Sequence, residues 1–302
     1  MNFDKLTKKD FNKASKILSG RYENSEASLT SMYIWQHYYN SQFCFEDDVL
    51  YTIYDKHGEK PFEAFMPYGK MRNSEFVTDK LIDFFQKEFG TNLTVNLATQ
   101  DYLDFLLSSK KYNINFTEIP ESFDYVYNIS DLIELSGKKY HAKKNHFNTF
   151  TNKYNYRYVR YDASMREKCM DFCEAVVAER TKNDIKSFNS EMESIFKAFD
   201  AYEELGLICS MIMIDDEIVA LSIGEIITDN YALIQVEKAS YNYRDAYPVI
   251  NKLMLENEFS HLEFVNREED LGILGLRKAK QSYHPCKMIK KYKIEFQDAT
   301  CV

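Results

Sequence analysis

The segment 207-LICSMIMIDDEIVALSIGEIITDNYALIQVEKA-239 decides the fold class of this chain. Three apolar or alternating runs, at 207–214, 218–227 and 231–239, are separated by Asp215-Asp216-Glu217 and Thr228-Asp229-Asn230. Apolar runs of this length joined by short polar turns are typical of consecutive antiparallel strands. We therefore expect a three-stranded antiparallel meander.

Helical patterns surround this meander. Ser190 and Glu193 form a capping-box pattern before a helical stripe, and Gly206 supplies a C-terminal stop. Pro248 suits the first turn of another helix. The predicted order in this half is strand 156–161, helix 163–180, helix 190–205, the meander, helix 248–259, strand 261–266, helix 275–283 and strand 287–296.

The N-terminal half repeats much of that order without repeating its residues. Its predicted elements are helices 8–18 and 26–39, strands 42–46, 49–54 and 62–66, helix 78–89, strand 93–98, helix 101–109 and strand 113–119. We expect an α+β fold of two tandem domains, 1–128 and 129–302, with the boundary near 124–130. Each is expected to have a mixed, mostly antiparallel sheet flanked by helices.

Composition indicates an ordered globular protein of 302 residues, since 9 Gly and 5 Pro stand against 22 Phe and 23 Tyr. The N-terminus lacks a signal-peptide pattern and no apolar run reaches about 18 residues, so we expect a cytoplasmic protein without a membrane span.

The six cysteines form no CxxC pair, which argues against a zinc ribbon or a disulfide framework. Cys169 and Cys173 fall on an apolar helical stripe, so we expect them in the core.

Basic residues are concentrated in two acid-free segments. Residues 138–160 and 277–293 each contain seven Lys or Arg, although the chain has a net charge of -9. This pattern fits either a solvated basic face or a shared anion site for a phosphate-bearing ligand. A pI near 5.3 argues against broad nucleic-acid binding, and a local contact with a tRNA acceptor end fits better.

Lys143 stands out within the first basic segment. If 138–154 is helical, Tyr140, Phe147, Phe150 and Tyr154 cluster on one side, and Lys143 projects into that stripe. Its ammonium group must then reach solvent, find a carboxylate or face a ligand. His141 and His146 are five residues apart, which does not match a helical metal pair, so no metal is expected.

Several segments resemble those of a family related to the C-terminal domain of phosphatidylglycerol lysyltransferases. They are 137-GKKYHAKKNH-146, 222-SIGE-225, 236-VEKA-239, 265-VNREEDLG-272 and 275-GLRKAK-280. The resemblance covers essentially the whole chain and implies two tandem GNAT-like acyltransferase domains. Relatives with known activity carry an amino acid from aminoacyl-tRNA to a lipid head group or a peptide amine.

The GNAT plan places a cleft where the fourth and fifth strands splay apart. Glu237 lies near the end of one of these strands and could take a proton from an attacking amine, with Asn266, Arg267 and Glu268 flanking it. A plain salt-bridge network among such residues is the alternative. The predicted substrate or phosphate contacts are Lys139, Tyr140, His141, Lys143, Lys144, Arg277, Lys278 and Lys280.

GNAT enzymes bind the pyrophosphate of acetyl-CoA on a glycine-rich turn, and the matching segment, Arg244-Asp-Ala-Tyr-Pro-Val249, has no glycine. The leading hypothesis is therefore an acyl or aminoacyl transferase that uses aminoacyl-tRNA as co-substrate, without a further cofactor. Its acceptor is an amine or hydroxyl of a lipid head group, peptide or small molecule, and peripheral membrane contact stays open. An acyl-CoA-dependent N-acyltransferase and a non-catalytic binding protein for a phosphorylated ligand are the alternatives.

Overall fold

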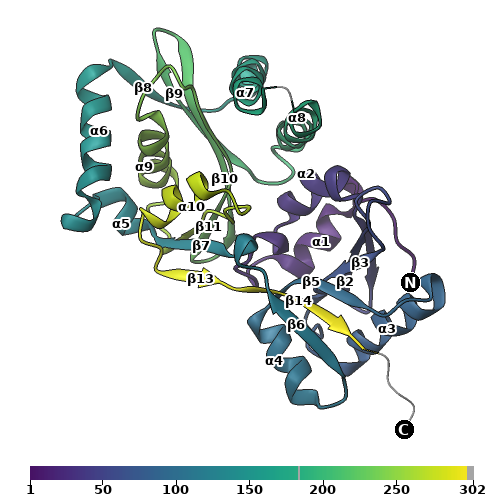
Figure 1. The fold of residues 1–302 in the computed structure, drawn as a ribbon. Helices are drawn as coiled ribbons and strands as arrows, with labels where there is room; N and C mark the ends of the chain where they lie inside the picture. Colours follow the sequence, from purple (N-terminus) through teal and green to yellow (C-terminus); the bar gives the residue numbers. More distant parts are fainter. Residues whose placement is uncertain (183, 298–302) are drawn as a thin grey trace. The chain divides into compact units, whose positions relative to one another are not determined.

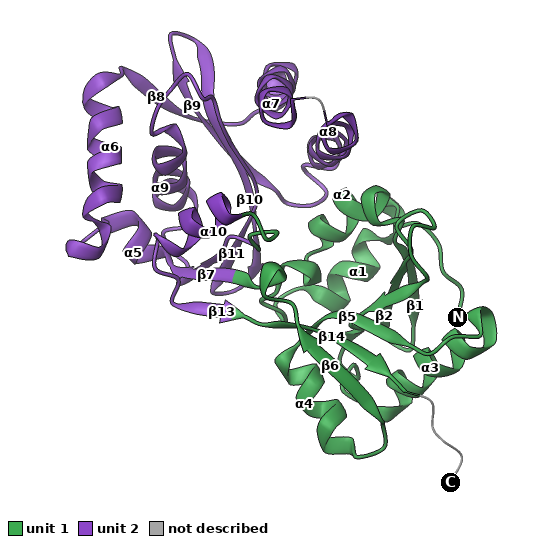
Figure 2. Cartoon of the chain, viewed as in Figure 1, with its two compact units in different colours: residues 1–124, 269–273, 289–302 green, residues 125–268, 274–288 purple. Residues whose placement is uncertain are grey.

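The computed structural model describes residues 1–182 and 184–297, which form two compact units (Figures 1 and 2). Unit 1 contains residues 1–124 and 269–273 and the C-terminal segment from residue 289. Unit 2 contains residues 125–268 and 274–288. The units are thus not the continuous ranges 1–128 and 129–302 that the sequence suggested.

Unit 1 is built on one mixed sheet. Its strand order is β1-β2-β3-β5-β14-β6, with β4 paired to β2. The strands are β1 (Gln42–Glu46), β2 (Val49–Tyr54), β3 (Glu63–Phe65), β4 (Tyr68–Gly69), β5 (Thr94–Thr99), β6 (Ile114–Glu118) and β14 (Lys291–Phe296). The helices are η1 (Lys8–Asp10), α1 (Phe11–Leu18), η2 (Ser25–Ala27), α2 (Leu29–Tyr39), α3 (Glu75–Phe89), α4 (Gln100–Ser109) and η3 (Pro120–Ser122).

Unit 2 contains the predicted meander in the middle of a second mixed sheet. The strand order is β13-β7-β12-β11-β10-β9-β8. The strands are β7 (Asp124–Asn128), β8 (Tyr156–Arg160), β9 (Ile208–Ile214), β10 (Glu217–Thr228), β11 (Tyr231–Ala239), β12 (Phe264–Asn266) and β13 (Lys287–Ile289). The helices are α5 (Ile129–Glu134), η4 (Lys138–Tyr140), α6 (His141–Lys153), η5 (Ala163–Met165), α7 (Arg166–Thr181), α8 (Ile185–Asp200), α9 (Ala246–Glu258) and α10 (Leu274–Gln281).

Helices cover both faces of the second sheet. α9 packs on β9, β10 and β11 and is itself contacted by α5 and α6, whereas α7 packs on β10 and β11 and against α8 (Figure 1). The α7 face buries Cys169 and Cys173, as the apolar stripe predicted. The predicted α+β class with two helix-flanked mixed sheets is confirmed.

Two strands account for the difference in unit boundaries. The predicted boundary region forms β7, whose first four residues are buried and which pairs with β12. The single strand expected at 287–296 is interrupted at Lys290, and its two parts join different sheets. A sequence pattern shows that a strand exists but not which sheet it joins, because pairing depends on residues far away in the chain. A smaller difference is that α8 begins at Ile185 with Asp184 as its N-cap, not at Ser190.

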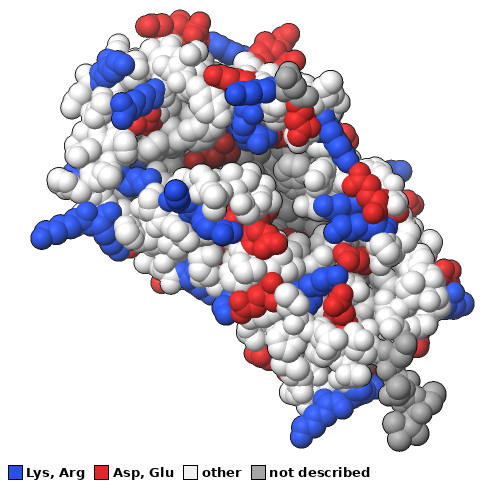
Figure 3. All heavy atoms as spheres, viewed as in Figure 1, with Lys and Arg blue, Asp and Glu red and all other residues white. Residues whose placement is uncertain are grey.

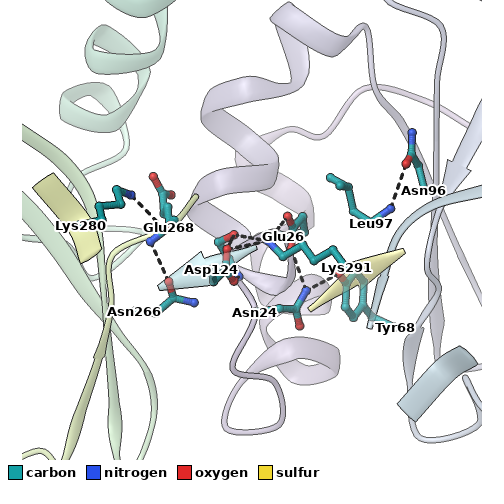
Figure 4. A network of polar contacts seen from close by, with 11 residues as sticks. Asn24, Glu26, Tyr68, Asn96, Leu97, Asp124, Asn266, Glu268, Lys280 and Lys291 are labelled. Carbon is teal, nitrogen blue, oxygen red and sulfur yellow. Dashed lines mark hydrogen bonds and ion pairs between the residues drawn. The ribbon is translucent and has the colours of Figure 1, made fainter. Parts of the chain in front are cut away.

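A buried charge cluster in unit 1 lies where the chain enters β7 and β14. Lys291 is fully buried and donates to Asp124 at 2.6 Å, to Glu26 and to the Ser25 hydroxyl at 3.1 Å (Figure 4). Asp124 also accepts from the Ser25 backbone N–H at 2.8 Å. Burial lowers the pKa of Lys291, but the two carboxylates outweigh it and raise the pKa above the usual value. Lys291, which lies in the second acid-free basic segment, is therefore a core residue.

Candidate active site

The candidate site in unit 2 begins where β11 and β12 part. The two strands pair in parallel from Tyr231–Phe264 to Leu233–Asn266. β12 then ends, whereas β11 continues to Ala239 along β10. The end of β11 therefore carries Glu237 beyond the last pairing with β12, beside the chain that follows Asn266.

Arg267 is the central residue of this site. Its Nη2 donates to Glu237 Oε1 at 2.8 Å, and the two side chains are 13% and 14% exposed. Burial lowers the pKa of Arg267, but Glu237 outweighs it and raises the pKa. The other terminal nitrogen, Nη1, is buried without a hydrogen-bond partner among the described residues. A buried guanidinium N–H without an acceptor costs free energy unless a ligand supplies that acceptor.

Glu237 is held from two directions, because its Oε2 also accepts from Asn251 of α9 at 3.4 Å. Both carboxylate oxygens are thus engaged in the structure. This arrangement makes Glu237 a counter-ion that positions Arg267, and it weakens the predicted role of Glu237 as the group that takes a proton from an amine.

Lys143 reaches the same site from α6. Its Nζ lies 3.8 Å from the centroid of the Tyr283 ring, and the Arg267 guanidinium lies 5.1 Å from the same centroid. Within the described residues, Lys143 has no ion pair or hydrogen bond through Nζ. Burial, and secondly the charge of Arg267, lower the pKa of Lys143 to about 8. Sequence reasoning found Lys143 through its place in an apolar stripe, but nothing in the sequence indicated Tyr283 as the ring that receives it.

The turn after β12 is fixed by residues from β12 and α10. Asn266 is fully buried, and its side-chain oxygen accepts from the Glu268 backbone N–H at 2.8 Å (Figure 4). Lys280 donates to the Glu268 carbonyl at 3.0 Å and also to the Arg267 carbonyl. Glu268 has a positive φ of 56°, which is strained for a residue with a side chain. Lys280 therefore holds the backbone beside Arg267, and the phosphate contact predicted for it stays a prediction.

No described interaction links the remaining predicted substrate contacts to Arg267. Lys139 pairs with Asp131 at 3.3 Å, and Tyr140 is buried with its hydroxyl donating to the Tyr283 carbonyl at 3.2 Å. His141, Lys144 and Lys278 are exposed, and Arg277 is partly buried. Tyr140 thus helps to fix the backbone of Tyr283.

The two basic segments do not form one continuous basic surface. Arg157 pairs with Asp216, Arg160 with Glu258 at 3.1 Å, Lys290 with Glu118 at 2.7 Å and Lys293 with Glu295 at 3.0 Å. Figure 3 shows basic and acidic side chains interspersed over the visible face. Several of these bases are therefore paired with acids in the folded structure, Lys293 with an acid of its own strand and the others with acids of other elements.

The start of α9 lies at the position that matches the glycine-rich turn of acetyl-CoA enzymes. Asp245 is the N-cap residue, with a positive φ of 70°. Its carboxylate lies 2.9 Å from His146 Nδ1 and 3.8 Å from Arg244 Nε. A carboxylate occupies the end of the helix that would otherwise favour phosphate.

Other chemistry has little support in the described parts of the chain. Residues 1–182 and 184–297 contain no group of three His, Cys, Asp or Glu side chains arranged to hold a metal ion. Cys44, Cys169, Cys173 and Cys209 are buried free thiols and Cys286 is an exposed one, while Cys301 lies outside the described residues. No described helix has both the length and the apolar character needed to cross a bilayer.

The fold and the diverging strands are those of a tandem GNAT-like protein. A tandem GNAT protein from the clavulanic acid biosynthesis pathway has a TM-score of 0.51 at 8% identity, covering 98% of each chain. No curated protein matches the sequence. This similarity shows the fold alone and confirms the predicted GNAT-like architecture.

The chain belongs to the family described as phosphatidylglycerol lysyltransferase, C-terminal, whose model matches residues 20–295. A conserved protein of unknown function from Bacteroides thetaiotaomicron VPI-5482 is 30% identical, with a TM-score of 0.89, over 98% of this chain and 100% of that one. L-PGS from Bacillus licheniformis is 11% identical, with a TM-score of 0.68, over 98% of this chain and 93% of that one.

Proposed function

We propose that this protein is an aminoacyltransferase that moves an amino acid from aminoacyl-tRNA to an amine or hydroxyl acceptor, with its active site at Arg267. The observation that carries the proposal is the buried, unpartnered Nη1 of Arg267. It lies where β11 and β12 part, next to a lysine that has no counter-ion among the described residues. Membership of the lysyltransferase-related family supports the choice of donor.

The chemistry of acyl transfer fits this arrangement. When an acceptor attacks an ester carbonyl, negative charge develops on the carbonyl oxygen. Arg267 Nη1 can donate to that oxygen, while Nη2 stays anchored on Glu237 and therefore fixes the direction of the free N–H. Transfer by direct attack needs no covalent enzyme intermediate, because positioning two substrates supplies much of the rate acceleration.

Charged tRNA provides the direct test. Bulk tRNA aminoacylated with a mixture of radioactive amino acids is incubated with the protein and with separate acceptors: phosphatidylglycerol vesicles, a mixture of short peptides, and glycerol. We expect enzyme-dependent movement of label from the tRNA ester to one acceptor class. No transfer to any acceptor, with acetyl-CoA active instead, would refute the proposal.

A variant pair links the activity to the site. Arg267→Lys keeps a positive charge beside Glu237 but removes the planar second N–H, so transfer should fall by roughly 100-fold or more. Arg157→Lys, at an exposed arginine of β8, is the matched control and should transfer normally. Equal activity of the two variants would argue against Arg267 as the group that stabilises the oxyanion.

A further inference from the structure

The proposed transfer requires a group that accepts the proton of the attacking amine, and Glu237 is poorly suited to that task. Its two carboxylate oxygens accept from Arg267 at 2.8 Å and from Asn251 at 3.4 Å. A base must have a free lone pair directed at the substrate. Another group near Arg267 must therefore be considered.

We propose that Lys143 is the proton acceptor of the transfer reaction. Its Nζ stands on the face of Tyr283, the same ring that lies under Arg267. No described residue accepts a hydrogen bond from Nζ. This inference rests on the proposed function, and it assigns to Lys143 a role in proton transfer instead of the phosphate binding that its sequence position suggested.

Burial and the neighbouring charge of Arg267 favour the neutral amine of Lys143. The face of Tyr283 attracts the ammonium form, but none of its three N–H donors meets a carboxylate among the described residues. Arg267 is the charged group whose field acts on Lys143, and its guanidinium is itself paired with Glu237. Tyr283 stays protonated, because burial raises its pKa to about 12. At pH 7 a group with a pKa of about 8 is neutral about one-tenth of the time, far more often than an ordinary lysine.

The proton and the electrons balance in the following step. The neutral acceptor amine attacks the ester carbonyl, a C–N bond forms, and the carbonyl π pair moves onto oxygen, which Arg267 Nη1 stabilises. The acceptor nitrogen gives its proton to Lys143 Nζ. The oxyanion then reforms the carbonyl, the C–O bond to the tRNA ribose breaks, and Lys143 returns the proton to the leaving ribose oxygen. The ammonium form of Lys143 is most stable while the oxyanion exists, because the two opposite charges then lie close together.

Trace labelling measures the amine directly and does not depend on turnover. The intact protein is treated with limiting acetic anhydride between pH 6 and 11, and each lysine is quantified by mass spectrometry. Lys153, an exposed lysine of the same helix that also lies over a tyrosine ring, is the internal reference. We expect half-maximal reactivity of Lys143 near pH 8, well below that of Lys153. A coincident midpoint would overturn the inference.

The transfer assay then separates proton transfer from charge. Lys143→Arg keeps the positive charge but cannot release a proton at neutral pH, so a proton acceptor predicts at least about 100-fold loss of transfer. Lys153→Arg should transfer normally. Full transfer by Lys143→Arg would overturn the inference and leave the proposed function standing, whereas absence of transfer by the unmodified protein would count against the proposed function and this inference with it.

Discussion

Lys291 is fully buried and Arg267 is 13% exposed, and the two cations differ in how completely their N–H groups are hydrogen-bonded. Lys291 is fully satisfied by Asp124, Glu26 and Ser25. Arg267 has one carboxylate, and its Nη1 has no partner among the described residues. A protein keeps an unsatisfied buried donor at a cost, so of these two cations Arg267 is the one that favours a bound acceptor.

The Lys291 cluster predicts an unusual pH dependence of stability. Burial raises the pKa of Glu26 from 4.5 to about 7; Lys291 opposes this, while Asp124 and Glu269 add to it. The folded protein therefore binds the Glu26 proton more tightly than the unfolded chain does. This contribution to stability is present at low pH and is lost as the pH rises from about 4.5 to about 7.

Replacing Glu26 by Gln should remove that dependence. Urea unfolding at pH 5, 6, 7 and 8 should show the variant gaining stability relative to the original protein as the pH rises. Parallel curves for the two proteins would mean that Glu26 ionises normally in the folded state.

Lys280 provides a second residue-level prediction, because it holds the carbonyls beside the candidate site. Lys280→Met leaves those carbonyls without their donor and should cost about 1–3 kcal/mol of unfolding free energy. It should also reduce transfer through displacement of Arg267. Lys278→Met, at an exposed position of the same helix, is the control for stability in chemical unfolding. Equal stability of the two variants would contradict the anchoring role.

At the scale of elements, local sequence patterns predicted the central strands but did not predict which strands pair with one another. The meander 207–239 appeared as β9, β10 and β11 because its apolar runs and acidic turns are local signals. β7 was missed, since its short sequence, DYVYN, resembles a linker until β12 pairs with it. In the site, periodicity identified Lys143 and Glu237, but Tyr283 and Asn251 become visible only when α6, α9 and α10 are packed.

The start of α9 gives a prediction about acetyl-CoA. Asp245 places a carboxylate at the helix N-terminus, Tyr247 is partly buried there, and Pro248 lacks an N–H. Phosphate binding at this turn would oppose that charge and lose a backbone donor. Calorimetric titration should therefore give no dissociation constant in the low-micromolar range. Such a constant would favour the acyl-CoA-dependent alternative.

At the scale of the whole chain, the exchange of strands makes the two units depend on segments distant in sequence. β14 lies in the sheet of unit 1 with β5 and β6 on either side. β7 lies between β13 and β12 in the sheet of unit 2. The chain therefore contributes its C-terminal strand to the first sheet, and a cut at the apparent boundary in sequence does not separate complete folds.

Fragments test this arrangement. Residues 1–128 lack β14, which leaves β5 as an exposed edge, β6 without its strand partner and Asp124 buried without Lys291. We expect this fragment to aggregate or to lack cooperative thermal unfolding. Residues 1–124 joined by a flexible linker to 289–297 contain every strand of the first sheet, and they should be soluble and unfold cooperatively by circular dichroism. The full chain, which keeps all of β14, is the control. A cooperatively folded 1–128 fragment would show that β14 is dispensable and that unit 1 is a self-contained domain after all.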